Sequence, residues 1–484
     1  MNMTLAQLQT WLPLAVQVNS TGQHAFSQGV QINAVRTDSR SVVPGDLFIA
    51  LKGETFDGTA FLMQAQSQGA VAVLFEANDL AHGEHLKYLE GVTVPAFCVS
   101  HVRQALGELA TQWRRQFDVS LIGVTGSNGK TTVTQMIASI LRADSSQASL
   151  STQGNLNNDI GVPLTLFNLR EQHRRAVVEL GMNHPGEIAV LARYAQPTVA
   201  LVNNAQREHQ EYMATVEAVA QENGEVIHAL PANGIAVFPA QDPYTALWQT
   251  FAGARKALTF GFAAGDVQAH DIAWTNGAWQ FNLSAAGQSL PCRLSIAGRH
   301  NVLNALASSA CALAAGMKLS DIVKGLENFE PVKGRSKSWE WQIAGHEFTL
   351  VDDTYNANPD SVRAAIDVLA ELSAPRVLVL GDMGEVGHQG PEFHAEVGAY
   401  AKSKGLDCLL TLGDLCQHSS AAFEGATHFK DMAALQQFVL EHIADFKSLV
   451  IKGSRFMKME RLVEALRDRT ESAQLQERET VHAA

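Results

Sequence analysis

The residues with the clearest chemical potential lie in one glycine-rich stretch, which reads Thr125-Gly-Ser-Asn-Gly-Lys-Thr-Thr132. Its glycines allow backbone N–H groups to close around an anion, and the free amides and dipole of a following helix favour negative charge. Lys130 would neutralise the β- and γ-phosphates of a nucleotide, and the hydroxyl of Thr131 would bind Mg²⁺. The stretch therefore predicts an ATP-binding phosphate loop made of Thr125, Gly126, Ser127, Asn128, Gly129, Lys130, Thr131 and Thr132.

This loop departs from the strict pattern G-x-x-x-x-G-K-[ST], which requires glycine where the chain has Val124. The chain has the tighter form G-x-x-G-K-T, with Gly126 and Gly129. The alternative is an ordinary glycine-rich turn before a basic helix. The strand pattern before the loop and the helix pattern after it favour a phosphate site.

Two more candidates follow apolar runs that predict strands. Glu179 ends the run 176–179, and His209 follows the run 198–204. Open α/β sheets bind ligands beyond the carboxyl ends of their strands, and Mg²⁺ prefers oxygen ligands. A strand-end carboxylate or a lone histidine can equally be structural, so both assignments depend on the neighbouring phosphate loop. With the loop present, we expect Glu179 to bind metal, whereas the residues alone leave the role of His209 open.

The last third of the chain contributes another polar group. Arg335 follows a glycine in the segment 331–335, and Asp352 and Asp353 end the apolar run 348–351. A strand-end aspartate can hold ribose hydroxyls, and an arginine from another domain can clamp a phosphate as a site closes. The alternatives are a surface arginine and turn-forming aspartates.

Near the start of the chain, one loop combines hydroxyl, carboxylate and guanidinium groups. It contains Thr37, Asp38, Ser39 and Arg40, and Lys52 follows the next predicted strand. Arginine and hydroxyl groups bind phosphate oxygens well, so this loop suits a diphosphate and sugar hydroxyls. The alternative is a solvated surface loop.

The elements that must position these residues follow an alternating pattern. A β-branched run at 119–124 predicts a buried strand before the phosphate loop, and apolar residues at helical spacing predict a helix at 131–141. Strand and helix patterns then alternate, which predicts a doubly wound, mostly parallel sheet. Residues 258–297 are β-rich, and the alanine-rich run 301–317 predicts a helix packed on a sheet.

The length of 484 residues predicts about three domains of α/β class. We expect a small α/β N-terminal domain at 1–101, a central P-loop domain at 102–325 and a Rossmann-like α/β domain at 326–484. Apolar runs at 376–380, 407–412 and 448–451 predict strands of the last domain. That domain lacks the G-x-G-x-x-G pattern of a dinucleotide site. We expect the polar tail after about residue 470 to fray.

Composition excludes several classes of protein. A hydrophobic content of 46% is typical of packed cores, and a net charge of −13 disfavours a general nucleic-acid or membrane-surface binder. The five scattered cysteines show no C-x-x-C pair, which predicts reduced thiols. The first basic residue is Arg36, which argues against a secretory signal. We expect a cytoplasmic monomer without membrane insertion.

Several segments together resemble one known family. They read Gly126-Ser-Asn-Gly-Lys-Thr-Thr132, Gly154-Asn-Leu-Asn-Asn-Asp-Ile-Gly-Val-Pro163, Val178-Glu-Leu-Gly-Met-Asn-His-Pro-Gly-Glu187, Gly298-Arg-His-Asn-Val-Leu-Asn304 and Asp352-Asp-Thr-Tyr-Asn-Ala-Asn-Pro359. In this order they are similar to the motifs of the Mur ligase family, over almost the whole chain. Asp382-Met-Gly-Glu385, Lys452-Gly-Ser-Arg455 and Thr37-Asp-Ser-Arg40 point to the members that add a dipeptide.

The resemblance implies an ATP-dependent ligase of peptidoglycan precursor assembly, with Mg²⁺ as cofactor. Its small-molecule substrates would be UDP-MurNAc-tripeptide and D-alanyl-D-alanine, and its products UDP-MurNAc-pentapeptide, ADP and phosphate. In the family, the tripeptide carboxylate is first phosphorylated to an acyl phosphate, which the dipeptide amine then attacks.

The resemblance also implies roles for individual residues. Lys130, Glu179 and His209 would be catalytic, and Thr131, Glu179 and His209 would hold metal. Asn301 and Asn304 would line the adenine site, Asp353 would hold the ribose and Arg335 would reach the phosphates. The substrates would contact Thr37, Asp38, Ser39, Arg40, Lys52, Asn157, Asn158, Tyr355, Asn356, Asn358, Lys452, Ser454 and Arg455.

One position departs from the family pattern. Many members carry a carbamylated lysine that bridges to a second Mg²⁺, and Asn223 stands at this position, in Glu222-Asn-Gly-Glu225. Asparagine cannot be carbamylated. Our hypothesis is that Asn223, or Glu222 or Glu208 nearby, replaces the carbamate.

Other functions are compatible with parts of this pattern. A ligase for a different amino acid, including a folylpolyglutamate-type enzyme, would share the fold. A P-loop switch would use ATP without ligation but would leave the first and last domains unexplained. A catalytically silent homologue is the third alternative, prompted by Asn223.

Overall fold

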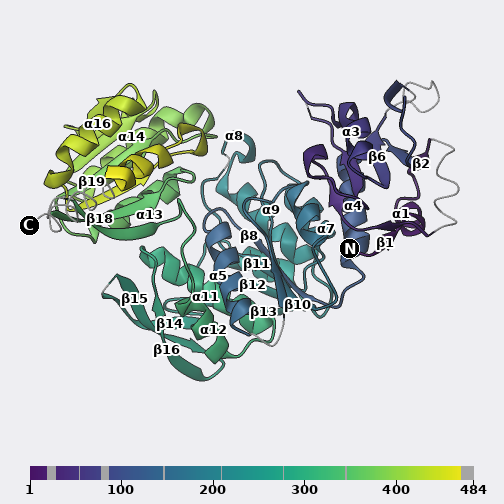
Figure 1. Cartoon of the computed structure of the whole chain (residues 1–484). Coiled ribbons are helices and arrows are strands. Elements are labelled where there is room, and N and C mark those ends of the chain that lie inside the picture. Colours follow the sequence, from purple (N-terminus) through teal and green to yellow (C-terminus); the bar gives the residue numbers. More distant parts are fainter. Residues whose placement is uncertain are drawn as a thin grey trace, which may run out of the picture.

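The structure is a computed structural model that describes residues 1–18, 29–53, 55–77, 87–144, 148–208, 210–275, 277–343 and 346–469. It has the α/β fold that the sequence predicts, with three domains in chain order (Figure 1). The polar tail expected to fray lies outside the described residues.

The N-terminal domain is built on a small sheet of order β2-β7-β6-β5-β4, in which β4 to β7 are parallel. A separate pair joins β1 and β3. The strands are β1 (Met3–Thr4), β2 (Val16–Gln17), β3 (Gln31–Ile32), β4 (Val35–Arg36), β5 (Leu47–Ala50), β6 (Ala72–Glu76) and β7 (Ala96–Val99). The helices are α1 (Leu5–Trp11), η2 (Ser39–Ser41), η3 (Gly58–Phe61) and α3 (Leu62–Ser67).

The central domain contains a long sheet of order β16-β15-β14-β13-β12-β11-β8-β10-β9. Strands β8 to β14 pair in parallel, and β14, β15 and β16 form an antiparallel extension. The strands are β8 (Ser120–Thr125), β9 (Ala148–Ser151), β10 (His173–Glu179), β11 (Val199–Val202), β12 (Ile235–Pro239), β13 (Lys256–Gly261), β14 (Val267–Thr275), β15 (Ala278–Ala285) and β16 (Gln288–Leu294). The helices are α4 (Val102–Arg114), α5 (Lys130–Ala143), α6 (Gly161–Leu166), α7 (Glu187–Ala195), α8 (Gln210–Met213), α9 (Val216–His228), α10 (Thr245–Ala252), α11 (Arg299–Ala314) and α12 (Leu319–Glu327).

Both faces of the central sheet are buried, which explains the continuous apolar runs of its strands. In β8, Leu121 packs on one face while Ile122 and Val124 pack on the other. Helices α4, α6, α7, α9 and α10 contribute to the first face, and α5, α11 and α12 to the second. The expected boundary at 325/326 falls within α12, whose Ile322 and Leu326 belong to the second core.

The C-terminal domain has a sheet of order β17-β18-β22-β19-β20-β21, parallel except for the β17–β18 pair. Its strands are β17 (Lys337–Ile343), β18 (His346–Asp353), β19 (Arg376–Gly381), β20 (Cys408–Leu412), β21 (Thr427–Phe429) and β22 (Ser448–Lys452). Its helices are α13 (Pro359–Ala370), η5 (Gly387–Gln389), α14 (Gly390–Ser403), α15 (Cys416–Phe423), α16 (Met432–His442), η6 (Ile443–Asp445), η7 (Arg455–Met457) and a last helix at 460–469.

The five cysteines are free thiols, as the sequence predicts, and all but the half-buried Cys408 are buried. Burial raises the pKa of Cys98 to about 11 and that of Cys292 to about 12. It also raises the pKa of Cys311, Cys408 and Cys416. Across the described ranges, every helix is too short or too polar to cross a membrane.

Candidate active site

A cleft of about 1350 Å³ opens between the central and C-terminal domains. The central domain lines it with the phosphate loop and with residues that follow β10 and β11. The C-terminal domain lines it with the turn around Arg335, the segment 355–361 and the loops at 384–386 and 452–455. The carboxyl ends of parallel strands from two domains therefore face one cavity, which is where open α/β sheets bind ligands.

The phosphate loop joins β8 to α5, as expected. Gly126 and Gly129 have φ angles of 132° and 82°, which L-residues with side chains rarely adopt. A Cβ atom at Gly129 would lie 2.7 Å from the Asn304 amide oxygen and 2.8 Å from the Asn203 amide nitrogen. Glycine is therefore required at this position by conformation and by space.

A chain of hydrogen-bonded carboxamides supports the phosphate loop. Asn203 Nδ2 donates to the Asn128 carbonyl oxygen at 2.8 Å and to Asn304 Oδ1 at 3.0 Å. Asn304 Nδ2 donates to Asn301 Oδ1 at 2.9 Å, and Asn301 Nδ2 donates to the carbonyl oxygen of Ala297 at 2.7 Å. Asn301 and Asn304 line the cleft, and their amides also hold the loop in place.

Lys130 folds back over its own loop. Its Nζ donates to the carbonyl oxygens of Gly126 at 2.6 Å and Ser127 at 3.3 Å, and it forms an ion pair with Glu208. The Lys130 and Glu208 side chains are only 14% and 7% exposed. A carboxylate therefore neutralises the ammonium group that the sequence assigns to the nucleotide phosphates.

Glu179 lies at the end of β10, beside the start of α5, and is buried. Its Oε1 accepts hydrogen bonds from Thr131 Oγ1 at 3.1 Å and from Asn157 Nδ2 at 2.9 Å. Its Oε2 is buried without a partner among the described residues. An unpaired buried carboxylate oxygen is costly, and a hydroxyl beside it completes an oxygen donor pair. This donor set fits a hard divalent cation such as Mg²⁺.

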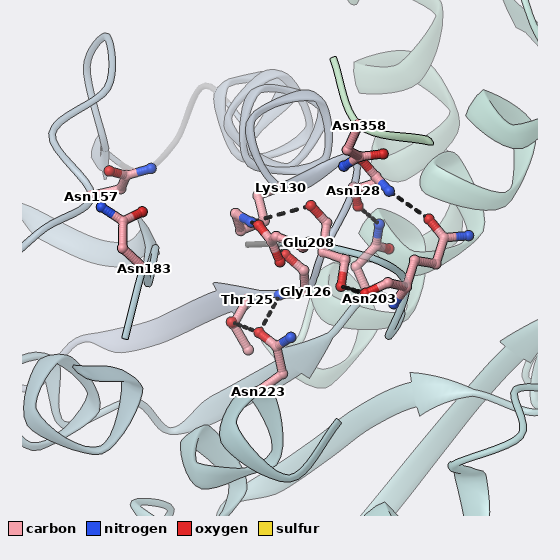
Figure 2. A network of polar contacts seen from close by, with 12 residues as sticks. Thr125, Gly126, Asn128, Lys130, Asn157, Asn183, Asn203, Glu208, Asn223 and Asn358 are labelled. Carbon is pink, nitrogen blue, oxygen red and sulfur yellow. Dashed lines mark hydrogen bonds and ion pairs between the residues drawn. The ribbon is translucent and has the colours of Figure 1, made fainter. Parts of the chain in front are cut away.

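Asn223 and Glu222, two of the residues proposed to replace the carbamate, accept hydrogen bonds from the phosphate loop and from the start of α7. Asn223 Oδ1 accepts hydrogen bonds from the Thr125 hydroxyl and from the Gly126 N–H at 3.0 Å (Figure 2). Glu222 uses both carboxylate oxygens at the start of α7, accepting from the Gly186 and Ile188 N–H groups at 2.8 Å each. Both side chains are already bonded through their oxygens. Glu208 is bonded as well, to Lys130, so the hypothesis that Asn223, Glu222 or Glu208 replaces the carbamate stays a prediction.

In the C-terminal domain, Asp353 and the buried Lys452 form an ion pair at 2.6 Å. Asp353 Oδ1 accepts from the Ser336 N–H at 3.1 Å, and Lys452 Nζ also donates to the Asn356 carbonyl oxygen at 2.9 Å. Ser454 Oγ accepts from Gly384 N–H at 2.7 Å. Asp353, Asn356 and Lys452 therefore line the cleft, and Ser454 bonds to Gly384, which also lines it.

Arg335 lines the cleft with its guanidinium 4.0 Å from the centre of the Tyr355 ring. Its Nε is buried without a hydrogen-bond partner among the described residues. Asp352, beside it, accepts from Gly334 N–H at 2.9 Å, and burial raises the pKa of this carboxyl. Arg455 lies 5.9 Å from the same Tyr355 ring. Two guanidinium groups therefore flank one aromatic side chain in a cleft that suits anionic ligands.

The predicted N-terminal residues are not among the described residues that line this cleft. Asp38 accepts from Arg40 Nη2 at 2.8 Å, and this hydrogen bond lowers the pKa of Asp38 to about 2. Ser39 Oγ donates to Gln64 Oε1 at 3.1 Å. Thr37 and Lys52 lie in the same domain.

Asn158 and His209 are two further residues that the sequence assigned to the site. Asn158 lines the cleft, and its Oδ1 accepts from the N–H of Gly161, the first residue of α6, at 2.8 Å. His209 lies outside the described residues.

Sequence reasoning missed the residues that support the loop from the end of β11. Asn203, Asn204 and Gln206 contact Ser127 or Asn128, and Arg207 contacts the C-terminal domain. Their signal was available: they directly follow an apolar strand that neighbours β8, at the ligand-binding edge of the sheet.

Comparison with known proteins gives the class to which this fold and cleft belong. Models described as the Mur ligase family catalytic domain, the Mur ligase middle domain and the Mur ligase glutamate ligase domain match residues 31–114, 124–312 and 339–455. The chain belongs to the Mur ligase family.

Its relatives narrow the comparison to one kind of ligase. The curated UDP-N-acetylmuramoyl-tripeptide–D-alanyl-D-alanine ligases of Haemophilus influenzae and Escherichia coli are 39% and 40% identical to it. Each alignment covers 91% of this chain, and 95% and 94% of those enzymes. A crystal structure of MurF from Acinetobacter baumannii matches with a TM-score of 0.86 and 34% identity over 96% of this chain and 99% of that one. MurF from Thermotoga maritima in complex with ADP matches with a TM-score of 0.79 and 26% identity over 91% and 98%.

Proposed function

We propose that this chain is an ATP-dependent ligase that joins D-alanyl-D-alanine to UDP-MurNAc-tripeptide, giving UDP-MurNAc-pentapeptide, ADP and phosphate. One observation carries the proposal: a phosphate loop and a C-terminal domain share one cleft in a chain whose curated relatives with this activity align over 91% of its length. A P-loop switch that uses ATP without ligation would not need the C-terminal domain as the second wall of this cleft.

The reaction takes place in two steps. The terminal carboxylate of the tripeptide attacks the γ-phosphorus of ATP, the bond to the β-phosphate oxygen breaks, and an acyl phosphate and ADP result. The dipeptide amine then attacks the acyl carbon, loses a proton, and expels inorganic phosphate as the amide bond forms. Both steps concentrate negative charge, which fixed cationic and N–H groups in a water-poor cleft stabilise.

The residues of the phosphate loop, the Thr131–Glu179 pair and Arg335 each have a part in this reaction. The loop N–H groups and Lys130 hold the phosphates, after Lys130 exchanges Glu208 for a phosphate oxygen. Thr131 and Glu179 would hold Mg²⁺, which neutralises phosphate charge when it is bound. Arg335 lies on the opposite wall, and its unpaired Nε can meet a phosphate or carboxylate oxygen.

The remaining assignments belong to the same proposal. Asp353 holds the ribose, and Asn301 and Asn304 lie at the adenine. The dipeptide side has Tyr355, Asn356, Asn358, Lys452, Ser454 and Arg455, and the tripeptide side Asn157 and Asn158. Thr37, Asp38, Ser39, Arg40 and Lys52 hold the UDP group, and His209 assists the metal. The enzyme works in the cytoplasm as a monomer, with domains divided near residues 101 and 325.

The test is phosphate release with ATP, Mg²⁺ and UDP-MurNAc-tripeptide, with and without D-alanyl-D-alanine. We expect release that requires both substrates and is lost in Lys130→Ala, but is retained in the control Lys324→Ala on the exposed side of α12. Release without either substrate would favour a switch, and a requirement for a different amine would correct the substrate. Absence of release at every Mg²⁺ concentration would favour a silent homologue.

A further inference from the structure

Arg207 ties the loop after β11 to the C-terminal domain. Its Nη2 lies 2.6 Å from Asp360 Oδ1, and its Nη1 lies 2.6 Å from Glu396 Oε2. The backbone N–H of Arg207 also donates to Asp360 Oδ2, at 2.9 Å. Asp360 is in the first turn of α13 and Glu396 is in α14, so one guanidinium joins two helices of another domain. A planar guanidinium with paired carboxylates is the strongest and most directional of the common ion pairs.

The ion pair is shielded from solvent and reinforced by its surroundings. The Arg207 side chain is 22% exposed, and its guanidinium carbon lies 5.3 Å from the centre of the Phe393 ring. The hydrogen bond from Arg207 lowers the pKa of the Glu396 carboxyl. Arg363, within the C-terminal domain, also donates to Glu396, at 3.0 Å.

The residues on each side of Arg207 contact the phosphate loop. Gln206 Oε1 accepts from Asn128 Nδ2 at 2.6 Å, and Glu208 forms the ion pair with Lys130. Asn128 Oδ1 in turn accepts from Asn358 Nδ2 of the C-terminal domain, at 2.9 Å (Figure 2). Within three consecutive residues, the chain therefore contacts the ATP site twice and the C-terminal domain once.

We propose that Arg207 is a positioning residue that docks the C-terminal domain against the phosphate loop, so that the dipeptide amine meets the phosphorylated carboxylate. This inference rests on the proposed ligase function and adds a residue outside its catalytic set. When Lys130 binds a phosphate, it must release Glu208. Because Glu208 is adjacent to Arg207, the segment that carries it is anchored to the C-terminal domain during this exchange. Alignment of the reacting groups, and not ATP affinity, is what Arg207 contributes.

The experiment compares Arg207→Met with Arg363→Met in the full chain. Both variants remove an arginine from Glu396, but only the first removes the contact between domains. We expect Arg207→Met to lower kcat or raise the dipeptide KM about tenfold or more, because small misplacements of reacting groups cost rate steeply. The Kd of a fluorescent ATP analogue should change less than about twofold, and Arg363→Met should stay within about twofold in all three quantities.

Two further variants separate docking from folding. Glu396→Gln should be harmful alone and add little to Arg207→Met, because both changes remove the same contact. Arg207→Lys keeps the charge but not the forked geometry, so it should fall between the wild type and Arg207→Met. Thermal unfolding of each variant confirms that the domains are folded.

A second readout does not depend on activity. Small-angle X-ray scattering should give a larger radius of gyration for Arg207→Met than for Arg363→Met. Equal kinetics and equal scattering in the two variants would overturn the inference. If the wild type itself shows no dipeptide-dependent phosphate release, the proposed function fails, and the scattering comparison alone decides whether Arg207 docks the domain.

Discussion

Asn223 illustrates how one side chain changes role when its chemistry changes. Where many family members would place a carbamate, this chain has a neutral amide whose oxygen accepts from Thr125 and Gly126. Its Nδ2 is buried without a partner among the described residues. Asn223 therefore holds the phosphate loop in this structure.

Replacing Asn223 should accordingly weaken nucleotide binding. In Asn223→Ala the Gly126 N–H and the Thr125 hydroxyl lose their acceptor, which costs about 1–3 kcal/mol for buried groups. We expect ATP affinity to fall about tenfold, as measured by titration with a fluorescent ATP analogue. Asn223→Asp keeps an acceptor oxygen and serves as the control. An unchanged Kd in Asn223→Ala would show that the loop holds its shape without this contact.

Replacing Glu208 should instead strengthen nucleotide binding. Its carboxylate competes with phosphate for Lys130, and both side chains are largely buried. In Glu208→Gln the ammonium group loses its anionic partner, so an ATP analogue should bind about tenfold more tightly, or by about 1.4 kcal/mol. The exposed Glu211→Gln, on the same segment, should leave the affinity unchanged. Weaker binding in Glu208→Gln would mean that the carboxylate supports the nucleotide, as a metal ligand would.

Among the helices and strands, the sequence predicted the strands whose residues form a clear apolar run. The apolar strands β8, β10, β11 and β19 were each expected within a few residues. The edge strand β9, Ala148–Ser151, gave no signal because short polar side chains carry little strand preference. The hydrogen bonds of Asn304 with Asn203 and of Lys452 with Asp353 could not be predicted, because each joins residues about a hundred positions apart in the chain.

The end of β19 is held to α14 and α15 by a buried cluster. Asp382 Oδ1 accepts from Cys416 N–H at 2.8 Å, and His394 Nε2 accepts from Met383 N–H at 2.9 Å. The other ring nitrogen of His394 donates to the Gly390 carbonyl oxygen at 2.7 Å. Ligand atoms of Asp382, His394 and Cys416 lie within 4.8 Å of one another, but these bonds use Asp382 and His394, and Cys416 Sγ donates to the Leu380 carbonyl oxygen at 3.5 Å. The cluster is therefore structural and requires a neutral histidine.

The cluster should make the C-terminal domain sensitive to acid. Burial lowers the pKa of His394 from its ordinary value of 6.5. Because the pKa of His394 is lower in the folded chain than in the unfolded chain, the stability that neutral His394 contributes is complete above a pH of about 6.5. This stability is lost as the pH falls below about 6.5. The loss is about 1.4 kcal/mol for every tenfold difference in proton affinity between the folded and unfolded chains. We expect the melting temperature to fall between pH 7.5 and 5.5 in the wild type, and to fall less in His394→Gln. Equal slopes would exclude His394 as the titrating group.

At the scale of the molecule, the three domains are joined unequally. One hydrophobic cluster contains Leu47 and Leu74 of the N-terminal sheet, Leu106 of α4, and Leu121 of the central sheet. The cores of the C-terminal domain contain only its own residues. The N-terminal and central domains thus share a core, whereas the C-terminal domain is held to them mainly by polar contacts around the cleft.

Unfolding should follow this division. We expect calorimetry to resolve one transition for the N-terminal and central domains and another for the C-terminal domain. Leu106→Ala should destabilise only the first transition and Leu378→Ala only the second, each by about 2–5 kcal/mol, because both leucines are fully buried. A single transition shifted equally by both variants would mean that the cleft contacts couple all three domains.

The burial of the native cysteines has a practical consequence for labelling the chain with dyes. A thiol reacts as its thiolate, and burial raises the pKa of every cysteine in the chain. Cysteines introduced at the exposed positions Lys324 and Lys430 will therefore take up maleimide dyes long before the native thiols do. Because the native thiols then stay unlabelled, single-molecule energy transfer between the two dyes can test whether the C-terminal domain moves relative to the central domain during turnover.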